Sequence, residues 1–198
     1  MQRRSEDGFL TFAAYEELGG LEGAIGRRAE EVFHALPETA QKELVPVLRA
    51  LTTVKGGKAT ARSAPLANFP PGSPRRVLVD VFLQSQARLL VADGDDAGAQ
   101  VRLSHEALLT HWPRARDQFT ADARDLELRG RLEQEAELWR AASRRDKAGR
   151  VRASGLPLAE ALALCARWRA DLPPAITEFV VASRRVARRR RIQPPARD

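Results

Sequence analysis

The sequence predicts a mostly α-helical protein, in which a small domain with a β wing comes first and an all-α array of helical hairpins follows. Apolar residues recur at helical spacing along most of the chain, whereas the alternating pattern of strands is confined to a few short stretches. Prolines also stand where helices are expected to begin, at Pro37, Pro74, Pro157 and Pro174. The length of 198 residues allows one large or two small domains.

The first half of the chain alternates predicted helices with short predicted strands. We expect helices over about residues 21–36, 37–51 and 73–86, a short strand within 59–66, and strands over 87–92 and 100–103. The order helix, helix, strand, helix, strand, turn, strand is that of a winged helix, with the turn at 93–98 as the tip of the wing. Residues 21–119 are therefore predicted to form a winged-helix-like domain.

The second half of the chain is predicted to be helical throughout. One helix is expected over 125–142, and others begin at Pro157 and at Pro173-Pro174 after a polar break at 144–150. These helices predict a helical arm over residues 120–191. Residues 1–20 are expected to be an N-terminal linker segment, and residues 192–198 a disordered tail.

The stretch from Val101 to Pro113 joins the last predicted strand to a helix. Val101 and Leu103 alternate with Arg102, and Ser104 is a good candidate for the residue that caps the helix. This places His105 in the first helical turn, where free backbone N–H groups and the helix dipole favour an anion.

Three segments of the chain resemble a known class of proteins. The segments LSHEALLTHWPRAR and LELRGRLEQEAELWRAA resemble the region that follows the ATPase module in bacterial STAND-class NTPases, large signalling proteins that often end in WD repeats. The segment YEELGGLEGAIGRRAEEVF is similar to the link between that module and the next domain. The resemblance covers about residues 7–191 and implies a winged-helix domain with its helical arm, separated from the nucleotide-binding core and the sensor repeats.

The resemblance also makes His105 the candidate nucleotide-binding residue. In this class, the winged-helix domain presents a histidine in a short Met-His-Asp-like motif to the nucleotide phosphates, which holds the inactive, ADP-bound state. The stretch from Leu103 to Leu108 resembles this motif, with Glu106 in the position of the acid and no methionine before His105. The alternative is a histidine that only caps the helix.

The sequence contains no ATPase motif, so we expect no enzymatic activity and no cofactor in this chain. In KGGKAT, Lys58 is followed by Ala59 instead of serine or threonine, and Thr52 and Thr53 stand where a phosphate loop needs its first glycine. ATP or ADP is expected only through a separate ATPase module. A zinc-binding helix would need a second histidine where Leu109 stands, so no metal site is expected.

The basic character of the chain is concentrated at its C-terminal end. The net charge is +7, but seven of the 33 basic residues and one of the 26 acidic residues lie in 184–198, which leaves 26 basic and 25 acidic groups elsewhere. This run is either a solvated helix end or a non-specific contact for nucleic acid or anionic membrane lipid. Its candidate contact residues are Arg184, Arg185, Arg188, Arg189, Arg190 and Arg191.

The composition predicts a cytoplasmic protein. Cys165 is the single cysteine and is expected in the core, and no apolar run reaches the length of a membrane span. No signal peptide is visible, since Met1 is followed by a polar stretch.

We therefore expect a non-catalytic regulatory and interaction module of a STAND-type NTPase, which couples the nucleotide state of an ATPase core to effector or sensor domains such as WD repeats. On this interpretation, the chain is expected to be a gene fragment, a product of a mis-assigned start, or a stand-alone derivative. The alternative is a winged-helix transcriptional regulator that binds DNA. The third helix is apolar on nearly all faces and has Asp80 at its centre, and the wing tip has Asp93, Asp95 and Asp96, which would repel phosphates.

Overall fold

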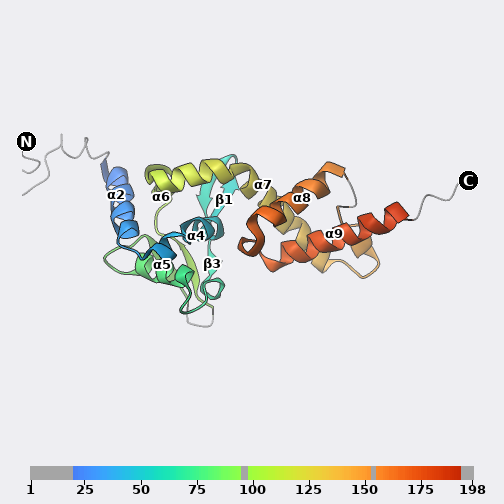
Figure 1. Ribbon diagram of the computed structural model, residues 1–198, viewed down its shortest axis with the longest axis horizontal. Helices are drawn as coiled ribbons and strands as arrows, with labels where there is room; N and C mark the ends of the chain where they lie inside the picture. Colours follow the sequence, from blue (N-terminus) through green and yellow to red (C-terminus); the bar gives the residue numbers. More distant parts are fainter. Residues whose placement is uncertain (1–19, 95–97, 153–154, 193–198) are drawn as a thin grey trace, which may run out of the picture. The chain divides into compact units, whose positions relative to one another are not determined.

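The computed structural model describes residues 20–94, 98–152 and 155–192, and it is mostly helical with two small antiparallel sheets (Figure 1). The predicted mostly-α fold class is thus confirmed. The chain divides into two compact units, residues 1–123 and 124–198. The division falls inside helix α7 (Pro113–Ala141), which also runs through the boundary expected at 119/120. The linker expected over 1–20 and the tail over 192–198 lie outside the described residues, apart from Gly20 and Ile192.

The first unit begins with helix α2 (Gly20–His34), followed by two short helices, α3 (Glu38–Gln41) and α4 (Leu44–Leu51). The sequence predicted a single helix in place of α3 and α4, and this was wrong. Pro46 has no N–H to donate, and its ring would clash with the carbonyl of Lys42 in a continuous helix. The chain therefore turns once before α4 begins.

The first sheet is a two-stranded hairpin, β1 (Thr52–Lys55) and β2 (Lys58–Ala61), in which Lys55 pairs with Lys58. Gly56 and Gly57 form its two-residue turn with φ values of 57° and 75°, a conformation that favours glycine at both positions. The sequence had indicated a flexible turn and a possible strand only after it. The KGGKAT stretch thus turns tightly between antiparallel strands, and no strand-to-helix phosphate loop is formed.

The second sheet has three antiparallel strands in the order β3-β5-β4. Strand β3 (Ala64–Pro65) lies against β5 (Gln100–Leu103), whose other edge pairs with β4 (Leu90–Asp93). A 3-10 turn (Leu66–Asn68) and helix α5 (Pro74–Leu83) connect β3 to β4. These are the elements on which the winged-helix prediction rests, and the wing tip at residues 95–97 lies outside the described residues.

Helix α5 ends three residues earlier than predicted. Its start is as expected, because the Ser73 hydroxyl accepts a hydrogen bond from the Arg76 N–H at 3.1 Å and Pro74 occupies the first turn. At its end, Gln84 is extended and Arg88 has a φ of 49°, so residues 84–89 turn back toward the sheet. The strand predicted over 87–92 therefore begins only at Leu90.

The core of the first unit forms where α2, α4, α5 and the three-stranded sheet meet α6 (Ala107–His111) and the start of α7. Helix α5 buries Leu78, Val79 and Phe82 within its own unit, while Val77 remains exposed. Helices α2 and α6 cross so closely that Gly26 of α2 has no room for a side chain: a Cβ atom there would lie 2.1 Å from the carbonyl oxygen of His111. A glycine at this position is therefore required for the crossing.

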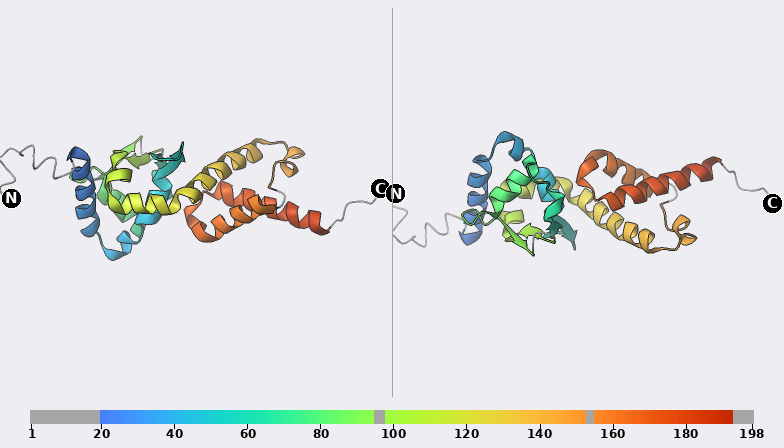
Figure 2. Two further views of the ribbon diagram at one scale, coloured as in Figure 1. Left: turned by 90° about the horizontal axis from the view of Figure 1, so that it is seen from above. Right: turned by 90° about the horizontal axis from the view of Figure 1, so that it is seen from below.

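The second unit contains the later part of α7, helix α8 (Gly155–Trp168) and helix α9 (Pro174–Ile192), with 3-10 turns at Asp146–Ala148 and Arg169–Asp171 (Figure 2). Its core includes Leu132, Leu164, Ile176 and Phe179, each fully buried. Trp139 packs on Phe179 with ring centroids 6.0 Å apart. Helices α8 and α9 form the antiparallel hairpin that the sequence predicted.

Candidate functional site

His105 is the middle residue of the three-residue link between β5 and α6, and its side chain is exposed. Helix α6 begins at Ala107, two residues later than needed to place His105 in its first turn. The carbonyl of His105 instead accepts a hydrogen bond from the Leu108 N–H at 3.2 Å. The predicted anion site at a helix start is therefore not formed, because α6 has only five residues and His105 precedes it.

The two neighbours of His105 are held by the strands around them. The Ser104 hydroxyl donates to the carbonyls of Arg88 at 2.6 Å and Leu89 at 3.1 Å, so it does not cap α6 as predicted. The Glu106 carboxylate accepts a hydrogen bond from the Ala61 N–H at the end of β2, at 3.2 Å. Both contacts fix the backbone on either side of His105. The imidazole is thus presented to solvent from an ordered segment.

A charged cluster joins α2 to the start of α7. The Glu30 carboxylate accepts hydrogen bonds from the Trp112 indole at 2.6 Å and from Arg114 at 2.6 and 3.2 Å, and the His34 ring lies 3.0 Å away. The Arg114 guanidinium also stacks on Phe33, 4.4 Å from the ring centroid. The hydrogen bonds from Arg114 and Trp112 outweigh partial burial and lower the pKa of Glu30 from 4.5 to about 2.

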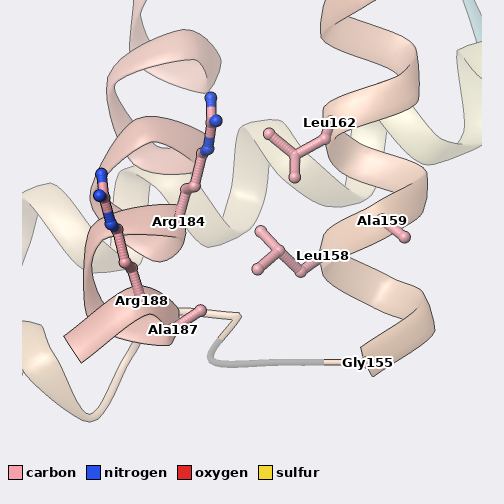
Figure 3. A pocket seen from close by; sticks show the side chains of 7 residues that line it. All are labelled: Gly155, Leu158, Ala159, Leu162, Arg184, Ala187 and Arg188. Atoms are coloured by element: carbon pink, nitrogen blue, oxygen red, sulfur yellow. The ribbon is translucent and has the colours of Figure 1, made fainter. Parts of the chain in front are cut away.

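The arginine run predicted from the sequence lies on the last three turns of α9. Arg184, Arg185, Arg188, Arg189 and Arg190 are exposed, whereas the side chain of Arg191 lies outside the described residues. Arg184 and Arg188 are one turn apart and line a groove between α8 and α9 (Figure 3). Of the arginines in this run whose side chains the structure describes, Arg185, Arg189 and Arg190 do not line it.

The groove has an apolar floor and a basic rim. The volume of the groove is about 350 Å³. Helix α8 lines it with Leu158, Ala159 and Leu162. Helix α9 lines it with Ala187, which stands between the two arginines in the sequence. In Figure 3 Leu158 and Leu162 point from α8 toward α9, while the side chains of Arg184 and Arg188 extend along α9. Sequence patterns indicated the arginines but not the groove, because Leu158 and Leu162 have the spacing of ordinary core residues.

The described residues offer neither a metal cluster nor a membrane-spanning helix. Within residues 20–94, 98–152 and 155–192, no group of three or more metal-ligating side chains is close enough to hold an ion. Among the same residues, no helix has the length and apolar composition needed to cross a membrane. Cys165 is half-buried and not fully in the core as predicted, and burial raises the pKa of its thiol.

The comparisons with known proteins gave one finding. The model of the family described as Novel STAND NTPase 1 matches residues 1–147, which include the whole first unit and the entire length of α7. The searches of curated proteins and of solved structures found no match.

Proposed function

Because this chain belongs to the Novel STAND NTPase 1 family, we propose that it is a non-catalytic regulatory module that couples the nucleotide state of an ATPase core to effector or sensor domains. The contact between α2 and the α6–α7 corner is the observation that supports this proposal most directly. Helix α2 makes up most of the segment that resembles the link to an ATPase module. A force on α2 would therefore act on this contact first.

Two features make the contact suited to transmission. At Gly26, the backbones of α2 and α6 touch without an intervening side chain, so neither helix can slide freely over the other. At Glu30, one carboxylate joins α2 to both Trp112 and Arg114. Helix α7 then contributes residues 113–123 to the first unit and 124–141 to the second. A displacement of α2 would thus reach an element that is part of both units.

His105 is the residue that we propose to contact the nucleotide phosphates of the ATPase core. It is exposed, and the anchored residues on both sides reduce the entropy lost when it meets a partner. An imidazole N–H can donate to a phosphate oxygen that is present in one nucleotide state and absent in the other. Its position in the link between β5 and α6 would connect that contact to the core of the first unit.

The DNA-binding alternative finds little support in α5. Arg75 donates to Glu43 at 2.8 Å and Arg76 donates to Asp80 at 2.7 Å, so both cations at the start of this helix are already engaged with carboxylates. Asp80 and Val77 are exposed on the same helix. A helix that reads base edges needs free donors on its exposed face, and this face offers an acid and a valine.

The experiment uses an ATPase module from a family member, prepared without its own winged-helix region. Phosphate release and ADP dissociation are measured for the module alone, for this chain alone, and for the two together. We expect no turnover by the chain alone, and slower ADP dissociation when it is added to the module. His105→Ala should reduce that effect several-fold, whereas Lys58→Ala, which removes an exposed cation from the β1–β2 turn, should not.

A defined turnover by the chain alone would overturn the non-catalytic assignment. Unchanged ADP dissociation in the mixture would overturn the coupling role. Sequence-dependent duplex binding that survives deletion of residues 184–198 would instead favour the DNA-binding alternative.

A further inference from the structure

We propose that the groove between α8 and α9 binds an amphipathic helix of a partner protein, whose apolar residues enter the groove and whose carboxylates pair with Arg184 and Arg188. This proposal rests on the proposed function, since it names the chemistry of one partner of the regulatory module. It concerns the second unit alone, whereas the coupling described above begins in the first.

The shape of the groove fits a single helical ridge. Its α8 wall extends from Gly155 to Leu162, a rise of about 10 Å, or two turns of an α-helix. Ala159 is exposed and Leu162 is half-buried, so apolar surface remains accessible at the floor. Small residues, Ala159 and Ala187, stand on opposite walls and let another helix approach closely. A volume of about 350 Å³ holds two or three side chains of leucine size.

The charges around the groove favour an acidic ligand. Five other arginines of the second unit are paired with carboxylates; these pairs are Arg124–Glu160, Arg129–Glu133, Arg140–Glu178, Arg152–Glu135 and Arg167–Asp125. Among the residues that the structure describes, no carboxylate lies within ion-pair distance of Arg184 or Arg188. A guanidinium can hold a carboxylate through two parallel hydrogen bonds, so a ligand that places one acid on each arginine gains both charge pairing and orientation.

The hollow form of the site favours a helix over a membrane or a nucleic acid. A bilayer or a duplex would meet the exposed arginines near the end of α9, and it would leave the floor of the groove unfilled. Leu158 and Leu162 would then contribute nothing to binding. Ile192, which follows Arg188 by one turn and is 70% exposed, extends the accessible apolar surface beyond the groove. An apolar stripe flanked by acids is the complement of this combined surface.

The test selects ligands from a displayed library of random 16-residue peptides, with the full 198-residue chain as the target. Enriched peptides are synthesised with a fluorophore, and their affinities are measured by fluorescence anisotropy at about 0.3 M salt, where the Debye length is below about 8 Å. Two double variants are compared, Arg184→Glu/Arg188→Glu in the groove and Arg185→Glu/Arg189→Glu outside it. The two double variants change the net charge of the chain by the same amount, and the two substituted residues have the same spacing along α9 in each. Ala159→Gln places a larger side chain on the α8 wall of the groove without adding charge.

We expect enriched peptides with leucine-like residues at helical spacing and flanking Asp or Glu. The groove pair and Ala159→Gln should each weaken their binding tenfold or more, and the outside pair less than threefold. Enriched peptides without this pattern, or equal weakening by both double variants, would overturn the proposal. So would anionic vesicles or duplex DNA binding more tightly than any peptide. The nucleotide assays of the ATPase mixture contain no peptide, so their outcome is independent of this one.

Discussion

Replacement of Gly26 by alanine tests the contact on which the proposed coupling depends. The added Cβ would lie 2.1 Å from the carbonyl oxygen of His111 and 2.8 Å from its carbonyl carbon. Even a close C–H···O contact spans about 3.3 Å, so the two helices must separate by about 1 Å. Both nearest atoms belong to the backbone, and no rotamer change can relieve the overlap. Helix α2 must therefore move away from α6.

The expected loss of stability follows from two opposing effects. Overpacking costs about 1–3 kcal/mol, and strain on the hydrogen bond from Trp112 to the Glu30 carboxylate adds about 1–2 kcal/mol. Alanine recovers about 1 kcal/mol, because it is the better helix former. We therefore expect Gly26→Ala to lower the free energy of unfolding of the first unit by about 2–3 kcal/mol.

Hydrogen exchange followed by mass spectrometry is the suitable assay, because it reports the two units separately and does not assume a single unfolding transition. Peptides from α2 and α6 should lose protection in Gly26→Ala. The matched control is Gly130→Ala in α7, where a Cβ would meet no atom within 4 Å. This control should gain about 0.5–1 kcal/mol of local stability. Unchanged or increased protection of α2 in Gly26→Ala would refute the close crossing.

Further predictions concern the charged groups of the first unit. The Glu30 carboxyl has a folded pKa of about 2 against 4.5 for the free group, so its contribution to stability is present above pH 4.5 and is lost as the pH falls toward 2. Its side chain is 34% exposed, and with that screening we expect the contribution to be about 1–2 kcal/mol. The free energy of unfolding measured with urea should therefore change less between pH 5 and 3 in Glu30→Gln than in the parent protein. Equal slopes of this free energy against pH in the two proteins would contradict the prediction. Asp122→Asn should lower the free energy of unfolding by about 2–3 kcal/mol in the same assay at pH 7. The change leaves the largely buried Arg49, which lies 2.7–3.0 Å from the Asp122 carboxylate, beside a neutral amide. A loss below about 0.5 kcal/mol, the level of an ordinary surface substitution, would contradict this prediction.

Local patterns predicted the elements whose ends are set by local chemistry. The Ser73-Pro74 start of α5 and the proline start of α9 were found where the sequence placed them, since a cap or a fixed φ acts within one turn. The strand β5 was also predicted residue for residue. These features depend on neighbours only a few positions away.

Apart from the break before α4, which Pro46 explains locally, the sequence failed where contacts with distant parts of the chain determine the structure. Ser104 has the side chain of a helix cap, yet its hydroxyl donates to the carbonyls of Arg88 and Leu89, sixteen and fifteen residues earlier. Gly26 resembles any helical glycine in the sequence, and its role exists only because His111 lies against it. The groove between α8 and α9 could not be predicted from the sequence for the same reason. Only the folded α8–α9 hairpin brings Leu158 beside Arg188.

The charges along α7 give the proposed coupling a physical path. Near its start, Arg114 is bonded to Glu30 of α2, and in its third turn Asp122 is bonded to Arg49 of α4. One turn later, Asp125 is bonded to Arg167 of the second unit. Arg114 and Asp122 of α7 thus pair with residues of the first unit, and Asp125, one turn further along the same helix, pairs with a residue of the second. Under the proposed function, a change in the α2 contact would have to reach Asp125 along this helix. Helix α7 is therefore the element of this chain through which the first unit would act on the second.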